Sequence, residues 1–231
     1  MRKIQRLAAV GTMAALTVAL AACGGSEQPA DTGAGADTGG DTAATSSAAA
    51  PTSDMAAAGG DGVTQTSDIF GPACDQVPTE GEGSAEGMVD DPVATAASNN
   101  PLLSTLVTAV GAVDGLADTL NSAEALTVYA PYNGAFEALG EETVNTLVAN
   151  PDQLAPILQY HVTDTRYDAE GLVEAGTTTM LNGGEVTIGG TADAPTLTDA
   201  MGNTVNVLCG NIPTANATVF VIDNVLMPAA S

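Results

Sequence analysis

One long segment that cannot fold on its own limits where this chain can form a core. Residues 24–66 are mainly Gly, Ala, Thr, Ser and Asp, and the only large apolar residues among them are Met55 and Val63. Such a segment cannot bury enough apolar surface to offset the conformational entropy lost on ordering it. Leu, Val and Ile become frequent further downstream. We therefore expect a disordered linker over residues 23–67 and a single folded domain over residues 68–231.

The N-terminus has the parts of a bacterial export signal. Three basic residues in the first six positions precede an uncharged run over residues 7–22, whose 16 residues are short of the ~20 that a membrane span needs. The run ends in Leu-Ala-Ala-Cys, followed by Gly-Gly. This resembles the bacterial lipobox, in which the Cys is diacylated and the preceding peptide is removed. We expect a signal peptide over residues 1–22 and a lipid on Cys23. An ordinary signal peptide that happens to precede a Cys is the alternative.

The charge of the chain restricts its partners. Four Lys and Arg stand against 28 Asp and Glu, and Arg166 is the single base outside the expected signal peptide. Nucleic acids and anionic membrane surfaces are bound by clustered basic residues. We therefore exclude nucleic acid as a partner. We expect the mature protein on the extracytoplasmic face of the cell membrane, held through a diacylglyceryl group on Cys23, with partial release as an alternative. The excess of carboxylates favours solubility, although adaptation to salt or weak binding of divalent cations would also account for it.

The pattern of apolar residues predicts helices first and strands later. The helix signals are an apolar face after Pro101 (Leu102, Leu103, Leu106, Val107, Val110), residues 113–120, a helix capped by Asn133, residues 141–147 and residues 154–160. The strand signals are residues 126–130, 177–181, 186–188, 205–208 and 217–222, with residues 224–227 as an extension of the sheet. This order predicts the α+β class, with helices on one side of a mostly antiparallel sheet.

Three motifs resemble the signatures of fasciclin domains. They are Leu-Thr-Val-Tyr-Ala-Pro-Tyr-Asn-Gly-Ala-Phe at residues 126–136, Leu-Gln-Tyr-His at residues 158–161, and Ala-Thr-Val-Phe-Val-Ile-Asp-Asn-Val-Leu-Met-Pro at residues 217–228. They occur in the family's order within a core of about residues 90–228, although Tyr132 replaces the usual Thr. With its lipobox, the chain resembles the single-fasciclin-domain antigenic surface lipoproteins of mycobacteria and related actinobacteria. The resemblance implies one domain in which N-terminal helices pack on a mostly antiparallel wedge of sheet.

The three cysteines agree with this resemblance. Assigning Cys23 to the lipid leaves Cys74 and Cys209, which can form a disulfide in an oxidising compartment. Neither residue has the spacing of a CxxC motif or a zinc ligand, and the chain has one histidine. We therefore expect a Cys74–Cys209 disulfide and no metal site.

Enzymatic chemistry has few candidate residues. His161 is the only histidine, so a Ser-His-Asp or Cys-His arrangement would depend on it. A hydrogen-bonded structural role for His161 beside Tyr160, between a helix and the next strand, agrees better with the sequence. The mature chain has no Lys, which removes Schiff-base and Ser-Lys chemistry. We expect no catalytic residue, no cofactor and no enzymatic activity.

The resemblance implies adhesion, or interaction with an unidentified extracellular protein or glycan. In animal relatives, integrin-directed segments lie around the Tyr-His motif and near Asp-Ile dipeptides. Tyr160 and His161 match the first feature, whereas Asp223 follows Ile222 instead of preceding it, which argues against carrying integrin over. Binding of a small apolar ligand in the cell envelope is the alternative. A single apolar pocket would favour that alternative, and a flat, polar exposed face would favour a protein or glycan.

Overall fold

The computed structural model of this chain describes residues 62–229. The expected signal peptide, most of the expected linker and the lipidation residue Cys23 lie outside these residues. The described part of the chain contains the α-helices α1 (Val93–Asn99), α2 (Ser104–Gly111), α3 (Leu116–Ser122), α4 (Asn133–Leu139), α5 (Glu141–Val148), α6 (Pro151–Gln159) and α7 (Ala169–Ala175). Three short 3-10 helices accompany them: η1 (Thr66–Asp68), η2 (Cys74–Gln76) and η3 (Pro101–Leu103).

The strands of the described residues form one sheet. They are β1 (Leu126–Pro131), β2 (Val162–Thr163), β3 (Thr177–Thr179), β4 (Glu185–Thr191), β5 (Ala194–Thr198), β6 (Thr204–Pro213) and β7 (Ala217–Ile222). Their order across the sheet is β2-β1-β7-β6-β5-β4-β3. Every neighbouring pair is antiparallel except β1 and β7, which run parallel. The α+β class and the mostly antiparallel sheet predicted from the sequence are confirmed.

Strands β1 and β7 lie at the centre of the domain because both of their faces are buried and mostly apolar. Every residue of the two strands is buried. In β1, Val128 packs into one core and the next residue, Tyr129, packs into a second core; in β7, Val219 and Phe220 divide in the same way. Such continuous apolar runs are typical of strands that are covered on both sides.

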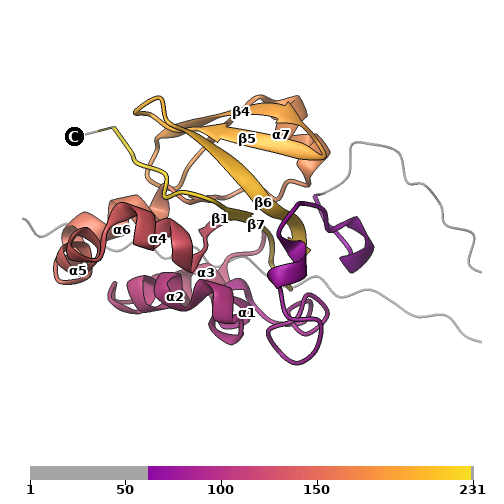
Figure 1. Ribbon diagram of the computed structural model, residues 1–231, viewed down its shortest axis with the longest axis horizontal. Helices are drawn as coiled ribbons and strands as arrows, with labels where there is room; N and C mark the ends of the chain where they lie inside the picture. Colours follow the sequence, from indigo (N-terminus) through magenta and orange to yellow (C-terminus); the bar gives the residue numbers. More distant parts are fainter. Residues whose placement is uncertain (1–61, 230–231) are drawn as a thin grey trace, which may run out of the picture. The chain divides into compact units, whose positions relative to one another are not determined.

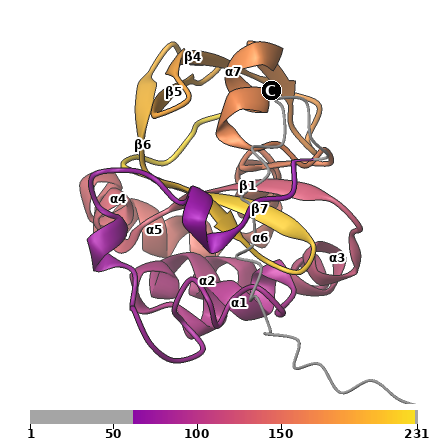
Figure 2. The ribbon, with the colours of Figure 1, turned by 90° about the vertical axis from the view of Figure 1, so that its right-hand side faces the viewer.

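The two cores lie on opposite faces of these central strands. The helices α1 to α6 cover one face, and we call the apolar cluster beneath them the helical core (Figure 1). On the other face, β4, β5 and β6 lie opposite α7, and the cluster between them is the sheet core (Figure 2). Helix α7 therefore lies on the side of the sheet opposite the other helices.

The helices of the helical core are short. Within residues 62–229, no single helix is both long and apolar enough to cross a membrane. The bent pair formed by Pro101–Gly111 and Leu116–Ser122 meets the length and composition required only when its two parts are counted together.

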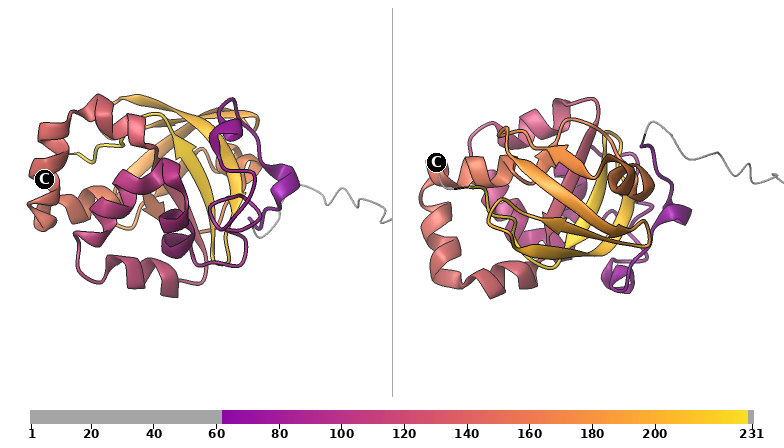
Figure 3. Two further views of the ribbon diagram at one scale, coloured as in Figure 1. Left: turned by 60° about the horizontal axis from the view of Figure 1, so that its bottom comes forward. Right: turned by 90° about the horizontal axis from the view of Figure 1, so that it is seen from above.

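The segment before α1 lies along β6. The backbone N–H of Gly210 donates to the Phe70 carbonyl at 2.8 Å, and Figure 3 (left) shows this indigo segment beside the yellow strands. Cys74 and Cys209 form a disulfide with their Cα atoms 4.9 Å apart. The first described residue already contacts the domain, since the carbonyl of Gly62 accepts a hydrogen bond from the Thr218 hydroxyl at 2.9 Å. The residues from Gly62 to position 67, which the sequence assigned to the linker, thus include some that contact the domain.

Two local predictions were wrong. Residues 224–227 form no strand in the described structure, and the backbone N–H groups of Leu226 and Met227 bond to side chains, as described below. Asn133 does not cap its own helix, α4. Its side-chain oxygen accepts from the backbone N–H of Thr105 at 3.0 Å, and its amide donates to the carbonyl of Pro101 at 2.9 Å. Asn133 therefore satisfies one of the free backbone N–H groups at the start of α2.

Candidate functional site

The Tyr-His motif lies where α6 ends and β2 begins, and both residues are buried. The Tyr160 ring enters the sheet core. Its hydroxyl donates to the carbonyl of Glu185 at 2.6 Å and accepts from the backbone N–H of Ala200 at 2.9 Å. Burial raises the pKa of this hydroxyl. Tyr160 also accounts for the absence of a side chain at position 184, because a Cβ on Gly184 would lie 2.7 Å from the Tyr160 ring.

His161 is fixed in one neutral form by its two neighbours. Its Nε2 accepts from the backbone N–H of Leu226 at 2.9 Å, so the ring proton lies on Nδ1 and is donated to the carbonyl of Ile157 at 2.8 Å. Burial lowers the pKa of His161 to about 4. Since both ring nitrogens are occupied, His161 has no nitrogen left to activate a nucleophile. Its contacts instead hold the segment after β7 against α6.

Asp223 is engaged within the sheet. Its carboxylate accepts two hydrogen bonds from Asn206, one from the backbone N–H at 2.9 Å and one from the side-chain amide at 2.7 Å. The Asp223 N–H donates to the Asn206 carbonyl at 3.1 Å. Asp223 therefore joins the end of β7 to β6, and neither carboxylate oxygen is left without a partner.

The sequence analysis missed a buried carboxylate, Asp199, in the turn between β5 and β6. Its side chain is 5% exposed. One oxygen accepts from the N–H groups of Met201 and Asn203, and the other accepts from the Asn203 amide and from the N–H of Met227. The bonds within the turn are typical of Asp in this position. The bond to Met227 depends on the tertiary fold, and it gives the segment after β7 a second attachment.

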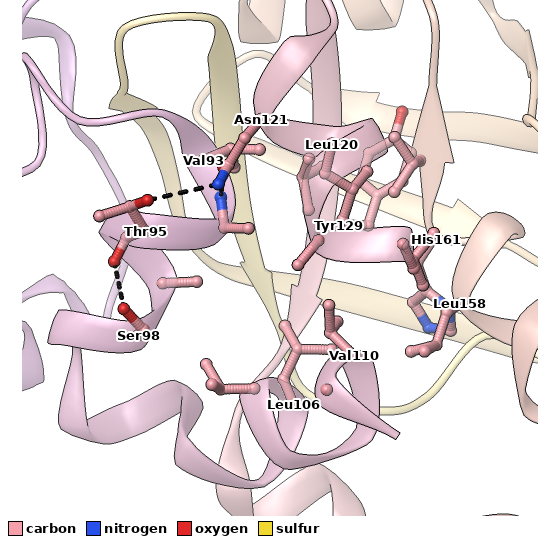
Figure 4. A pocket seen from close by; sticks show the side chains of 18 residues that line it. Val93, Thr95, Ser98, Leu106, Val110, Leu120, Asn121, Tyr129, Leu158 and His161 are labelled. Carbon is pink, nitrogen blue, oxygen red and sulfur yellow. Dashed lines mark hydrogen bonds between the residues drawn. The ribbon is translucent and has the colours of Figure 1, made fainter. Parts of the chain in front are cut away.

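An apolar pocket of about 300 Å³ opens beside His161, between α1, α2 and α3. The buried residues of its lining come from several elements: Val93, Leu106, Leu116, Leu120, Val128, Tyr129, Leu158, His161 and Val162. Thr95 and Ser98 of α1 and Gly111 of α2 are exposed at its mouth. Figure 4 shows Thr95 and Ser98 on one side of the pocket and Leu158 and His161 on the other.

The few polar groups of the pocket are uncharged. The Asn121 side chain accepts from the N–H of Ala94 at 2.9 Å and donates to the Thr95 hydroxyl at 3.4 Å. The Ser98 hydroxyl donates to the carbonyl of Thr95 at 2.6 Å. No Asp, Glu, Lys or Arg side chain lines the pocket. It is therefore suited to an apolar occupant with, at most, a neutral polar end.

A second candidate surface is the outer face of the sheet. Strand alternation directs Val186, Leu197 and Val205 into the sheet core and leaves polar residues on the opposite side. The strand register aligns four threonines in one row across β3, β4, β5 and β6, which we call the threonine row: Thr177, Thr187, Thr198 and Thr204. Beside it lie the cross-strand pairs Thr179–Glu185 and Thr196–Asn206. Glu185 is the only charged residue among these eight.

The described residues contain no group of three or more His, Cys, Asp and Glu side chains placed to hold a metal ion. The two candidate surfaces thus consist of an apolar pocket and a hydroxyl-rich face on which Glu185 is the one charged residue named, and the Tyr-His motif lies buried within the fold.

The domain thus has two cores that share the parallel pair β1 and β7, and its Tyr-His motif is buried. Residues 101–228, more than half of the chain, match the family model described as the fasciclin domain. The chain belongs to the fasciclin family.

Relatives and a solved structure agree with this assignment. The cell surface glycolipoprotein MPB83 and the immunogenic protein MPB70, both of Mycobacterium bovis, are each 43% identical to this chain over 171 residues. These alignments cover 71% of this chain and 74% and 84% of the two relatives. A FAS1 domain pair from the insect cell adhesion molecule fasciclin I has the same fold, with a TM-score of 0.54 and 16% identity. That comparison covers 61% of this chain and 52% of the insect chain.

Proposed function

We propose that this chain is a lipid-anchored cell-surface protein whose fasciclin domain binds an extracellular protein or glycan without catalysing a reaction. Homology to a protein named as a cell surface glycolipoprotein supports a cell-surface, adhesion-type role. The lipobox supports an anchor at Cys23. The buried and fully hydrogen-bonded His161 supports a domain that binds and does not catalyse.

The threonine row is the observation that carries this proposal. Thr177, Thr187 and Thr204 are exposed and Thr198 is half-buried. The hydroxyl of Thr177 donates to the carbonyl of Gly176 and can still accept, and the other three hydroxyls offer both donors and acceptors to a partner. Phosphate or sulfate groups would meet a chain with a net charge of −24 and no cation on this face. The partner is therefore a neutral glycan or a polar protein surface that carries few acidic groups.

A charge placed on this face tests the proposal. Thr187→Arg puts a long cation in the middle of the threonine row, whereas Thr146→Arg makes the same change on the exposed surface of α5. We expect Thr187→Arg to abolish retention of protein or glycan from extracellular-matrix and envelope fractions, while Thr146→Arg retains the same material as the parent protein. Equal retention by the two variants would show that the threonine row is not the binding surface.

A second function is favoured by the pocket between α1, α2 and α3, which is the kind of apolar recess that the small-ligand alternative requires. In that function, the domain holds a small apolar molecule at the cell envelope. The two functions use different surfaces, because no residue of the threonine row lines the pocket. Each function can therefore be tested separately.

A further inference from the structure

We infer that the pocket between α1, α2 and α3 binds a neutral molecule with a single aliphatic chain, such as a medium-chain alcohol or a monoacylglycerol, in preference to fatty-acid anions. This inference rests on the second of the two functions proposed above and specifies the chemistry of its ligand. The size of the pocket, its mouth and its charge each support it.

The volume of the pocket limits the ligand to one short chain. At roughly 30 Å³ for each water-sized group, the 300 Å³ of the pocket holds a chain of about eight to ten carbons. This is at the lower end of the volumes of small-molecule sites in proteins. The two long chains of a phospholipid exceed this volume. The buried side chains Leu106, Leu120 and Leu158 give the chain an apolar surface to contact.

The mouth of the pocket provides a neutral hydrogen bond. The Thr95 hydroxyl already accepts from Asn121, and its own proton has no acceptor within residues 62–229. It is exposed, so that it can donate to the oxygen of an alcohol or an ester. Small residues beside it, such as Ala94, Ala97 and Gly111, leave room for a head group.

The charges around the pocket disfavour a carboxylate. No Lys or Arg lines it, and its one titratable imidazole, His161, uses both ring nitrogens within the fold. The guanidinium of Arg166 donates to the carbonyls of Thr214 and Ala217 and is not part of the lining. A fatty-acid anion would lose hydration at the mouth without gaining a counter-ion. The acidic charge of the whole chain adds to this cost.

Direct titration distinguishes these ligand classes. The protein is the full mature chain carrying Cys23→Ser, so that no detergent competes for the pocket, and the probes are 1-decanol, 1-decanoylglycerol and decanoate at neutral pH. We expect saturable binding of both neutral probes by calorimetry and binding of decanoate weaker by at least about tenfold, the scale of one lost charge partner.

Three variants link the binding to this pocket. Ala117→Leu fills it from α3, and Ala138→Leu makes the same change at an exposed position of α4. We expect the first to lose binding of the neutral probes and the second to keep it, with both folded by circular dichroism. Ser98→Lys adds a cation at the mouth and should bring decanoate to within a few-fold of 1-decanol.

The outcomes separate the inference from the function on which it rests. Decanoate binding as tightly as 1-decanol to the parent chain would overturn the neutral-ligand inference and leave the pocket as an apolar binding site. The same holds if Ser98→Lys leaves the preference unchanged. If none of the three probes binds, or if Ala117→Leu binds them like Ala138→Leu, the pocket does not hold such ligands and both statements fall.

Discussion

The two cores on either side of β1 and β7 are filled in different ways. Large rings fill the sheet core: Tyr129, Tyr160 and Phe220 are completely buried, and the centroids of the Tyr129 and Phe220 rings are 6.1 Å apart. The helical core is mainly aliphatic, and Phe136 is the only aromatic ring among its buried residues. Its helices α1, α2 and α3 are two turns long and carry small residues such as Ala97 toward one another.

This difference explains why the pocket lies under the helices. A fully packed core leaves few voids larger than a water molecule. Small side chains on short helices leave part of the volume between α1, α2 and α3 unfilled, and the buried leucines below it keep the void apolar. The sheet core has hydrogen-bonded tyrosine hydroxyls and contributes rigidity. Aromatic rings thus fill one half of the domain, while the other half contains the apolar pocket.

Truncating one leucine in each core tests this comparison and has the largest expected effect. Leu172 of α7 is fully buried in the sheet core, and Leu120 of α3 lines the pocket. We expect Leu172→Ala to lower the free energy of unfolding by about 4 kcal/mol and Leu120→Ala by about 2–3 kcal/mol, because the cost depends on the cavity that remains. Because one side of the Leu120 side chain faces the pocket, it makes fewer packing contacts that the substitution could remove.

Urea unfolding of both variants measures this difference. Leu139→Ala, at a half-buried position of α4, serves as a third comparison and should cost less than Leu172→Ala. Equal losses at Leu120 and Leu172 would mean that the two cores are packed alike and that the pocket side is not loosely filled.

Protonation of His161 should have the next largest effect on the free energy of unfolding, since the neutral ring holds the segment after β7 to α6. Its pKa of about 4 in the folded protein lies below the usual value of 6.5, so the unfolded chain binds a proton first as the pH falls. Folding therefore loses stability between pH 6.5 and pH 4, by about 3 kcal/mol for this shift. We expect the loss in urea unfolding curves recorded across this range.

A variant without the imidazole isolates this effect from the many carboxylates that titrate nearby in pH. His161→Gln keeps a side-chain oxygen that can accept from the N–H of Leu226, yet it does not titrate in this range. Its stability at pH 7 should be lower than that of the parent, and its decline toward pH 4 should be shallower. Parallel declines of the two proteins would assign the acid sensitivity to the carboxylates.

The sequence predicted those parts of the fold that have a strong local pattern. The pattern predicted a strand over residues 217–222 and a helix with an apolar face that includes Leu106, and the structure has β7 and α2 there, with Leu106 buried. Helix α7 was missed because only Ala169 and Leu172 of its seven residues are buried, too few for a periodic signal. Strand β5 was missed because it contains Pro195, a residue that is uncommon inside strands.

Neither candidate surface could be predicted from the sequence. The pocket exists because α1, α2 and α3 meet over β1, and no segment of the chain encodes that meeting alone. The threonine row depends on the strand register: Thr187 lies opposite Thr198 only once the turn between β4 and β5 is known. By contrast, the sequence singled out His161 and predicted a hydrogen-bonded structural role for it, because it is the only histidine of the chain. Both of its ring nitrogens take part in hydrogen bonds in the structure.

The smallest expected effect on stability comes from Cys23→Ser, which tests the anchor separately from both cores. The hydrogen bonds and packing described above lie within residues 62–229, so the melting temperature of the folded domain should not change. The variant should nevertheless leave the membrane fraction and appear in the medium, or remain an unprocessed precursor, because the lipid is the only expected membrane contact. Cell fractionation and calorimetry measure the two results.

A Cys23→Ser protein that is processed and extracted by detergent like the parent would disprove lipid anchoring. A lowered melting temperature would show that the N-terminal region packs against one of the cores, and repeating Leu120→Ala and Leu172→Ala in the Cys23→Ser background would identify which one.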